Sequence, residues 1–186
     1  MQDLPLSPVS GRIHVCPLIA VPDVVTAFQA AYLLSCLPRE VRVETPACIR
    51  PENHARLFIH DIAEPVDGHI APDAEHVAQI IAFAAAWDRQ AAMVVHCWAG
   101  ISRSTAAAFI ALCAINPEAQ EGHVARLLRE ASPTAYPNRL MVRLGDAALG
   151  REGRMMAAVE AIGRGVLASE AAPFSLPADL SSWHGR

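Results

Sequence analysis

The stretch that decides the fold is AAMVVHCWAGISRSTAAAFIALCAI, residues 91–115. Its first residues are apolar without alternation, which predicts a central parallel strand covered on both faces. Residues 105–115 are apolar all round, which predicts a buried helix beginning near Arg103. The polar nonapeptide HCWAGISRS, residues 96–104, therefore interrupts two core elements, and an interruption of this kind indicates a functional site.

The residues before this stretch predict strands alternating with helices. Asp73 is a suitable N-cap for a helix whose apolar stripe contains Val77, Ile80, Ile81, Ala84 and Trp87. The other expected elements are strands over 12–18, 31–37 and 55–62, an edge strand over 41–44, and a short helix over 22–28.

The last third of the chain predicts helices. Asn116 and Pro117 are expected to act as N-cap and first residue of a helix over 117–131. Further helices are expected over 138–149 and 152–168. The pattern predicts an α/β fold with a mostly parallel central sheet flanked by helices and a helical C-terminal layer. We expect a single domain over 1–170 and a flexible tail over 171–186.

Composition excludes several classes of function. The chain has 186 residues, 53% of them apolar, and a formal net charge of -4. Nucleic acid is therefore not an expected partner, because nucleic-acid binding needs a basic surface. The first residues lack the pattern of a signal peptide. The 14 uncharged residues between Arg103 and Glu118 are too few to span a membrane, so no membrane partner is expected.

Cysteine usage indicates the compartment. The five cysteines are scattered and include no Cys-x-x-Cys pair, which favours neither a disulfide framework nor a zinc site. We expect a protein of the reducing cytoplasm, with four cysteines buried as small apolar residues and Cys97 as the exception.

The nonapeptide has the parts of an anion site. A strand ending at Cys97, a turn containing Gly100 and a helix beginning near Arg103 direct backbone N–H groups at one point. The same field favours the thiolate form of Cys97. Arg103 can hold two phosphate oxygens with its planar fork, and Ser104 can donate to the sulfur. His96 is expected to brace the loop, and the expected phosphate-binding residues are Trp98, Ala99, Gly100, Ile101, Ser102 and Arg103.

These parts predict a two-step phosphoryl transfer. The Cys97 thiolate attacks phosphorus, and water hydrolyses the resulting cysteinyl phosphate. The amides and Arg103 supply the charge stabilisation that a metal ion supplies elsewhere, so no cofactor is expected. His60, Asp61, His69 and His76 lack the spacing of a metal site, and no metal is expected.

The arrangement His96-Cys97-x5-Arg103-Ser104 resembles the signature of the protein tyrosine phosphatase superfamily. The size of the chain, and ASPTAYPN some 30 residues later, are similar to the compact dual-specificity branch over residues 12–150. The sequence HCWAGISRSTAAA also resembles the corresponding segment of a group of bacterial tyrosine-phosphatase-like proteins. The resemblance implies a dual-specificity-phosphatase-like fold and hydrolysis of phosphomonoesters.

The resemblance also implies an aspartate that protonates the leaving group, on a loop about 30 residues before the cysteine. Asp61 lies 36 residues upstream of Cys97, and Asp67 lies 30 residues upstream. We favour Asp61, since the end of a strand holds a side chain better than the tip of a glycine-containing loop. Asp67 remains the alternative.

The variable loop positions indicate the substrate. Trp98, Ala99, Ile101 and Ser102 carry no positive charge, which favours a singly phosphorylated protein or small phosphomonoester over a polyanion. Trp98 either lines the pocket or packs beneath the loop. One alternative function is a non-catalytic phosphate- or phosphopeptide-binding module, and another is arsenate reduction or sulfur transfer with the same loop. The sequence does not predict an oligomeric state.

Overall fold

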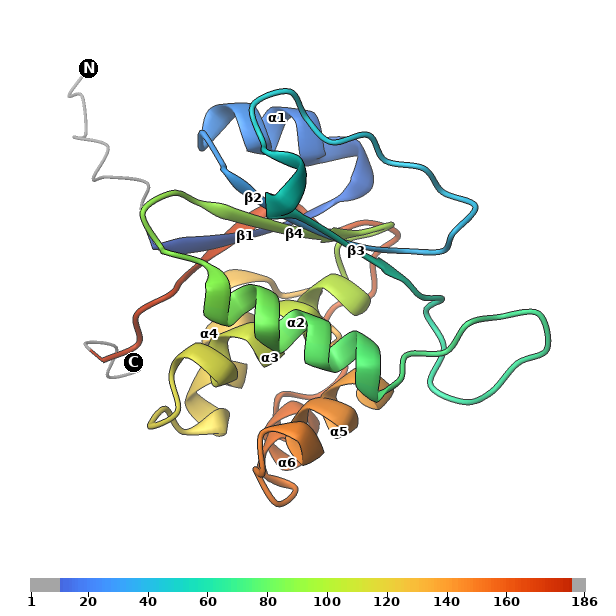
Figure 1. Cartoon of the computed structure of the whole chain (residues 1–186). Helices are drawn as coiled ribbons and strands as arrows, with labels where there is room; N and C mark the ends of the chain where they lie inside the picture. Colours follow the sequence, from blue (N-terminus) through green and yellow to red (C-terminus); the bar gives the residue numbers. More distant parts are fainter. Residues whose placement is uncertain (1–10, 182–186) are drawn as a thin grey trace.

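The computed structural model describes residues 11–181, which form a five-stranded sheet with helices on both faces (Figure 1). The strand order is β3-β2-β4-β1-β5; the first four strands are parallel, and β5 is antiparallel to β1. The strands are β1 (Arg12–Pro17), β2 (Tyr32–Leu37), β3 (His54–Phe58), β4 (Met93–Cys97) and β5 (Phe174–Pro177). The predicted α/β class with a mostly parallel sheet is confirmed.

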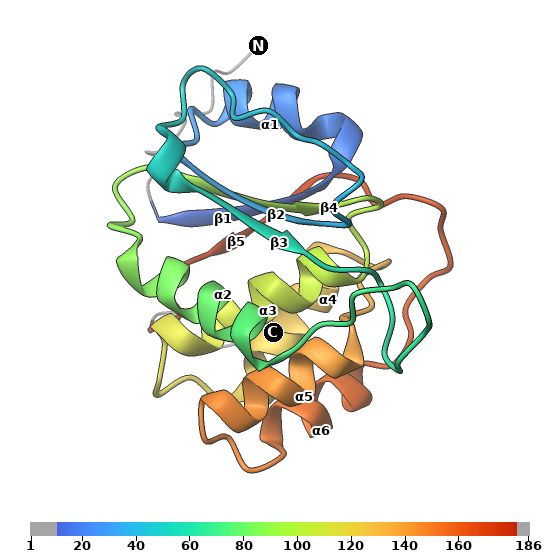
Figure 2. The same ribbon diagram turned by 45° about the vertical axis from the view of Figure 1, so that its right-hand side comes forward.

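The helices divide unequally between the two faces of the sheet. Figures 1 and 2 show α1 on one face and α2 to α6 on the other. The helices are α1 (Val21–Ala27), α2 (Ala74–Ala86), α3 (Arg103–Ile115), α4 (Glu121–Ala131), α5 (Arg139–Ala148) and α6 (Arg154–Ile162), with short 3-10 turns η1 (Leu18–Ala20) and η2 (Pro51–Asn53). No helix in the described range is long and apolar enough to cross a membrane.

Helix α3 is the centre of the larger helical layer. Every residue from Arg103 to Cys113 is buried, because α3 contacts the sheet on one side and α2, α4 and α5 on the others. This surrounding explains why the helix is apolar all round. The N-cap of α2 is also confirmed: Asp73 accepts a hydrogen bond from the His76 N–H, and the His76 ring accepts one from the Asp73 N–H.

The expected tail is wrong for residues 174–177. These residues form β5, which pairs with β1 and buries Leu176 completely. The strand forms because β1 would otherwise be an unpaired edge of the sheet. Residues 182–186 of the expected tail lie outside the described residues.

Further predicted elements are also wrong. The helix expected over 152–168 is α6, which ends at Ile162. Helix α4 begins at Glu121, because Asn116 caps the end of α3 and its Nδ2 donates to the carbonyls of Leu112 and Ala178. No strand forms over 41–44, where the chain crosses the α1 side of β2 and β3. The strand expected to reach residue 62 ends at Phe58.

Candidate active site

The segment that follows β4 forms a loop at the edge of the sheet where all four parallel strands end. We call residues 97–103 the Cys97 loop. It begins at the last residue of β4, whose partner in the β1 register is Pro17. It ends at Arg103, the first residue of α3. The structure therefore places the predicted strand, turn and helix as the sequence indicates.

The carbonyl groups of the Cys97 loop point outward into the rest of the fold. Four of them accept hydrogen bonds from separate parts of the chain, which clamp the loop from several sides. The bonds are Leu18 N to Trp98 O (3.0 Å), Ala171 N to Ala99 O (2.9 Å), Tyr136 N to Ile101 O (2.9 Å), and both Ala106 N (3.0 Å) and Asn138 N (3.2 Å) to Ser102 O.

The amide groups of the same loop are unpaired. Within residues 11–181, the N–H groups of residues 98–105 donate to no backbone or side-chain acceptor. Backbone donors at buried positions are almost always satisfied, so a run of free donors at a helix N-terminus indicates an absent acceptor. With the carbonyls turned outward, these amides provide the donor set of an oxyanion cradle.

Cys97 is the buried residue from which this loop starts. Its side chain is 1% exposed, and Sγ lies 3.1 Å from the hydroxyl oxygen of Ser104. Ser104 is completely buried in the first turn of α3. The Ser104 hydroxyl can therefore donate to a thiolate at Cys97 and stabilise its negative charge.

Arg103 is buried, and its Nε has no hydrogen-bond partner within residues 11–181. Its Nη1 donates to the carbonyl of Ile59 at 3.0 Å, which fixes the guanidinium plane at the end of β3. Its buried Nε donates no hydrogen bond to the described residues and lies 3.8 Å from a carboxylate oxygen of Asp61. A buried guanidinium with an unsatisfied donor beside free amides indicates an oxyanion ligand.

Asp61 is brought to the Cys97 loop by two hydrogen bonds. The Ser102 hydroxyl donates to its Oδ1 at 2.7 Å, and the Asn138 Nδ2 donates to the same oxygen at 2.9 Å. Asn138 also caps α5 by accepting from the Met141 N–H. Sequence reasoning did not single out Asn138; the only local signal was its position as an N-cap before a helical pattern.

Asp67, the alternative acid, lies outside this cluster, and Trp98 belongs to the loop but points to solvent. Asp67 is in the exposed segment between β3 and α2, where its backbone carbonyl interacts with the His69 ring at 3.1 Å. The Trp98 side chain is 58% exposed, so it does not pack beneath the loop. No group of three or more potential metal ligands occurs among residues 11–181.

His96 joins the loop to a polar chain that sequence reasoning missed, buried at His96, Ser35 and His54 and exposed at Arg56. Its Nε2 lies 2.6 Å from the Ser35 hydroxyl, which lies 2.8 Å from His54 Nε2. His54 Nδ1 lies 2.9 Å from the Thr45 hydroxyl, which accepts from Arg56 at 2.6 Å. At the other end, His96 Nδ1 makes a long hydrogen bond of 3.4 Å to the carbonyl of Cys97.

The two ends of this polar chain, together with neutral histidines, give the hydrogen bonds a single direction. Arg56 can only donate and the Cys97 carbonyl can only accept, so the donors run from Arg56 through Thr45, His54, Ser35 and His96 to the loop. With each histidine neutral, one nitrogen donates and the other accepts, and this direction satisfies both rings.

Burial favours the same protonation state for both histidines. Burial, with a smaller effect of Arg56, lowers the pKa of His54 to about 4. Burial also lowers the pKa of His96 to about 4, and the Arg103 charge acts in the same direction. The expected brace at His96 is therefore a neutral imidazole held mainly by Ser35.

Gly100 is required at the centre of the loop, which gives a first prediction. Its φ is +73°, and an added Cβ would lie 2.8 Å from Pro17 N and 3.0 Å from Cys16 C. We expect Gly100→Ala to lower the free energy of unfolding by about 2–3 kcal/mol, because the clash adds to the backbone strain. Gly150→Ala is the control: its φ is +62° with nothing within 4 Å of the added Cβ, so it should lose only about 1 kcal/mol. Urea unfolding compares the two; equal losses would contradict the predicted clash.

Sequence comparisons and structure comparisons differ for this chain. No family model and no curated protein sequence matches it. Solved structures do match. DUSP15 is 16% identical, with a TM-score of 0.58 over 84% of this chain and 92% of that chain.

Two further structures give the same result. The PTP-2 phosphatase of Cydia pomonella is 14% identical, with a TM-score of 0.56 over 75% of this chain and 86% of that chain. The Yvh1 phosphatase domain from Chaetomium thermophilum is 19% identical, with a TM-score of 0.50 over 77% of this chain and 93% of that chain. The chain therefore has a dual-specificity-phosphatase-like fold.

Proposed function

We propose that this protein is a cysteine-dependent phosphomonoester hydrolase, of the protein tyrosine or dual-specificity phosphatase type. The observation that carries the proposal is the run of unpaired N–H groups over residues 98–105, in the loop that begins at Cys97, together with the free Nε of Arg103. This donor set fits the three terminal oxygens of a phosphate ester. The fold of the matched phosphatases supports the same conclusion.

The reaction has two steps. The Cys97 thiolate attacks phosphorus, the bond from phosphorus to the ester oxygen breaks, and Asp61 gives its proton to the departing oxygen. Water then attacks the cysteinyl phosphate, Asp61 takes a proton from that water, and inorganic phosphate and the thiolate are released. The free amides and Arg103 stabilise the equatorial oxygens in both steps, and the Ser104 hydroxyl stabilises the sulfur as it leaves.

The substrate is a singly phosphorylated protein or small phosphomonoester. The loop positions that differ among such sites carry Trp98, Ala99, Ile101 and Ser102, which offer no cation for a second phosphate. A reduced Cys97 is needed for the chemistry, so we place the protein in a reducing compartment, the cytoplasm.

A second candidate function is a non-catalytic module that binds phosphate groups. Asp61 accepts from Ser102 and Asn138 and lies near Arg103. All three contacts suit an ionised carboxylate, and such a carboxylate could brace the loop without delivering a proton.

A substrate panel separates the two functions. The wild-type protein is incubated with p-nitrophenyl phosphate, with an alkyl phosphate and with phosphotyrosine, phosphoserine and phosphothreonine peptides, and released phosphate is measured. Turnover of at least one ester supports the hydrolase. An inert protein that still binds phosphopeptide supports the module and overturns the hydrolase.

The choice of the acid gives a second prediction. Asp61→Asn should lower kcat by about 10²- to 10³-fold for an alkyl or phenyl phosphate, and much less for p-nitrophenyl phosphate, whose leaving group needs no proton. It should also flatten the alkaline fall of the pH-rate profile. Asp67→Asn is the matched control, and its rates should stay near those of the wild type. An equal loss for all leaving groups would instead make Asp61 a brace.

A further inference from the structure

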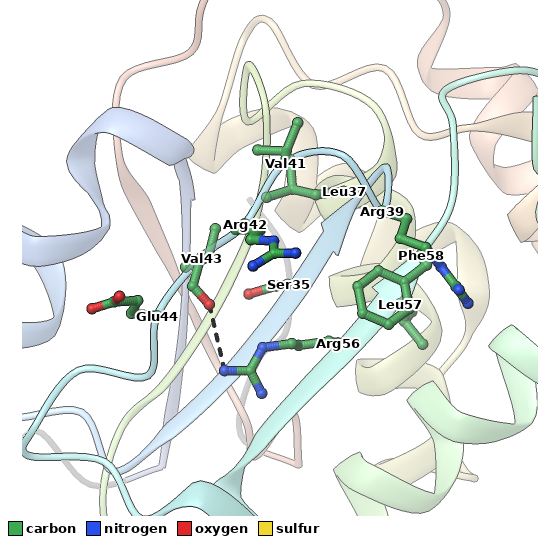
Figure 3. A pocket seen from close by; sticks show the side chains of 10 residues that line it. All are labelled: Ser35, Leu37, Arg39, Val41, Arg42, Val43, Glu44, Arg56, Leu57 and Phe58. Carbon is green, nitrogen blue, oxygen red and sulfur yellow. Dashed lines mark hydrogen bonds between the residues drawn. The ribbon is translucent and has the colours of Figure 1, made fainter.

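A second hollow with unpaired positive charge lies apart from the Cys97 loop. It has a volume of about 660 Å³ and is formed by β2, β3 and the segment between them (Figure 3). None of its lining residues belongs to the Cys97 loop. A hollow of this size suits a small molecule.

Two arginines point into this hollow. Figure 3 shows the guanidinium groups of Arg42 and Arg56 on either side of the Ser35 hydroxyl. Arg56 is held in place by the Thr45 hydroxyl at 2.6 Å and the Val43 carbonyl at 3.4 Å. Arg42 is exposed. No described carboxylate lies within ion-pair distance of either guanidinium.

The two other charged lining residues do not fill this role. In Figure 3, the Glu44 carboxylate lies beyond Val43 and away from the two guanidinium groups. The Arg39 guanidinium lies over the ring of Phe58, 5.4 Å from its centroid, at the far side of the hollow. Two cations therefore face the same space, and their mutual repulsion would be relieved by an anion between them.

The residues that line the hollow indicate the chemical character of the group that carries the anion. Leu37, Val41 and Phe58 line the hollow beside the arginines, and Phe58 is exposed. The charge of two guanidinium groups matches that of a phosphate monoester, which is close to -2 at neutral pH. We propose that this hollow binds the phosphate group of a small phosphate monoester whose body is apolar or aromatic. This inference does not rest on the proposed hydrolysis.

The test uses the full-length Cys97→Ser protein, which cannot turn the probe over. Phenyl phosphate is titrated while amide shifts are followed by NMR, so that each site reports separately. We expect saturable shifts over residues 41–44, with any binding at the loop seen separately over 98–103. Inorganic phosphate, which lacks the ring, and benzoate, which has one negative charge, should both bind the hollow more weakly than phenyl phosphate.

Variants assign the binding to the arginines. Arg42→Ala should weaken binding at residues 41–44 at least tenfold; because Arg42 makes no hydrogen bond or ion pair with described residues, its loss leaves the fold intact. Arg56→Lys keeps the charge but loses the fork, and should also weaken binding. Arg50→Ala, which removes an exposed arginine paired with Glu52 at 3.6 Å outside the hollow, should change nothing.

Three results would overturn the proposal. Shifts confined to 98–103 would show that the loop is where this probe binds. An unchanged dissociation constant in Arg42→Ala would show that Arg42 does not bind the anion. Tighter binding of benzoate than of phenyl phosphate would show that the hollow prefers a carboxylate to a phosphate group. Binding at the hollow without any at the loop would leave this proposal standing and count against the proposed hydrolysis.

Discussion

Replacing Cys97 with serine is expected to lower kcat for p-nitrophenyl phosphate by on the order of 10⁵-fold while phosphate binding is retained. A serine hydroxyl is not ionised at neutral pH, and the group nearest to it would be the Ser104 hydroxyl, 3.1 Å from the present sulfur. Ser104 cannot act as a base. The nucleophile is therefore lost, but the amides over 98–105 and the Arg103 fork remain to hold the anion.

The control for this variant is Cys48→Ser. Cys48 is exposed and free, and it lies in the segment between β2 and β3, so its replacement should leave kcat unchanged. The other three cysteines are poor nucleophiles, because burial raises the pKa of Cys16 and of Cys113 to about 12 and raises that of Cys36 as well. Steady-state rates and binding of inorganic phosphate, measured on both variants, check the prediction. Full turnover by Cys97→Ser would show that Cys97 is not the nucleophile.

The central part of the fold was predictable because its determinants are local. The strand ending at Cys97, the turn at Gly100 and the helix from Arg103 form one continuous segment, and each element has its own pattern of apolar residues. An apolar helix without a polar face can only be stable at the centre of a layer. The position of α3 follows from its composition alone.

The residues that sequence reasoning missed contribute through contacts far apart in the chain. Ser35 and His96 are 61 residues apart, and Asp61 and Asn138 are 77 apart. A buried serine between two histidines has no periodic signal, since its role depends on the register of β2, β3 and β4. Tertiary contacts of this kind are invisible to local patterns.

The predictions for β5 and for the start of α4 were wrong for a related reason. Four residues with a proline at the end of β5 look like a loop, but the strand pairs at the sheet edge, where a proline is tolerated. Asn116 is a good helix cap by composition, yet its side chain is used to hold the backbone near Ala178 and Leu180. In both cases the partner, rather than the local sequence, decides the structure.

Acidification from pH 7 to pH 5 is expected to lower the free energy of unfolding by several kcal/mol, at most about 6 kcal/mol. Burial lowers the pKa of three histidines, His14, His54 and His96, each to about 4, whereas in the unfolded chain the value is about 6.5. The stability that depends on neutral histidines is complete above pH 6.5 and is lost as pH falls toward 4. At pH 5, each histidine accounts for at most about 2 kcal/mol.

Protonation should also weaken the support of the Cys97 loop. Protonating His54 or His96 breaks the single direction of donors that runs from Arg56 to the Cys97 carbonyl. A protonated imidazole has no acceptor nitrogen, so the hydroxyl that donated to it loses the acceptor for its proton. Urea unfolding at pH 7 and pH 5 measures the difference. In His54→Gln, whose amide can both donate and accept, this difference should shrink by at most about 2 kcal/mol. The difference should be unchanged in His69→Gln, which alters an exposed ring. An equal pH dependence in wild type and His54→Gln would show that His54 does not contribute to the loss of stability in acid.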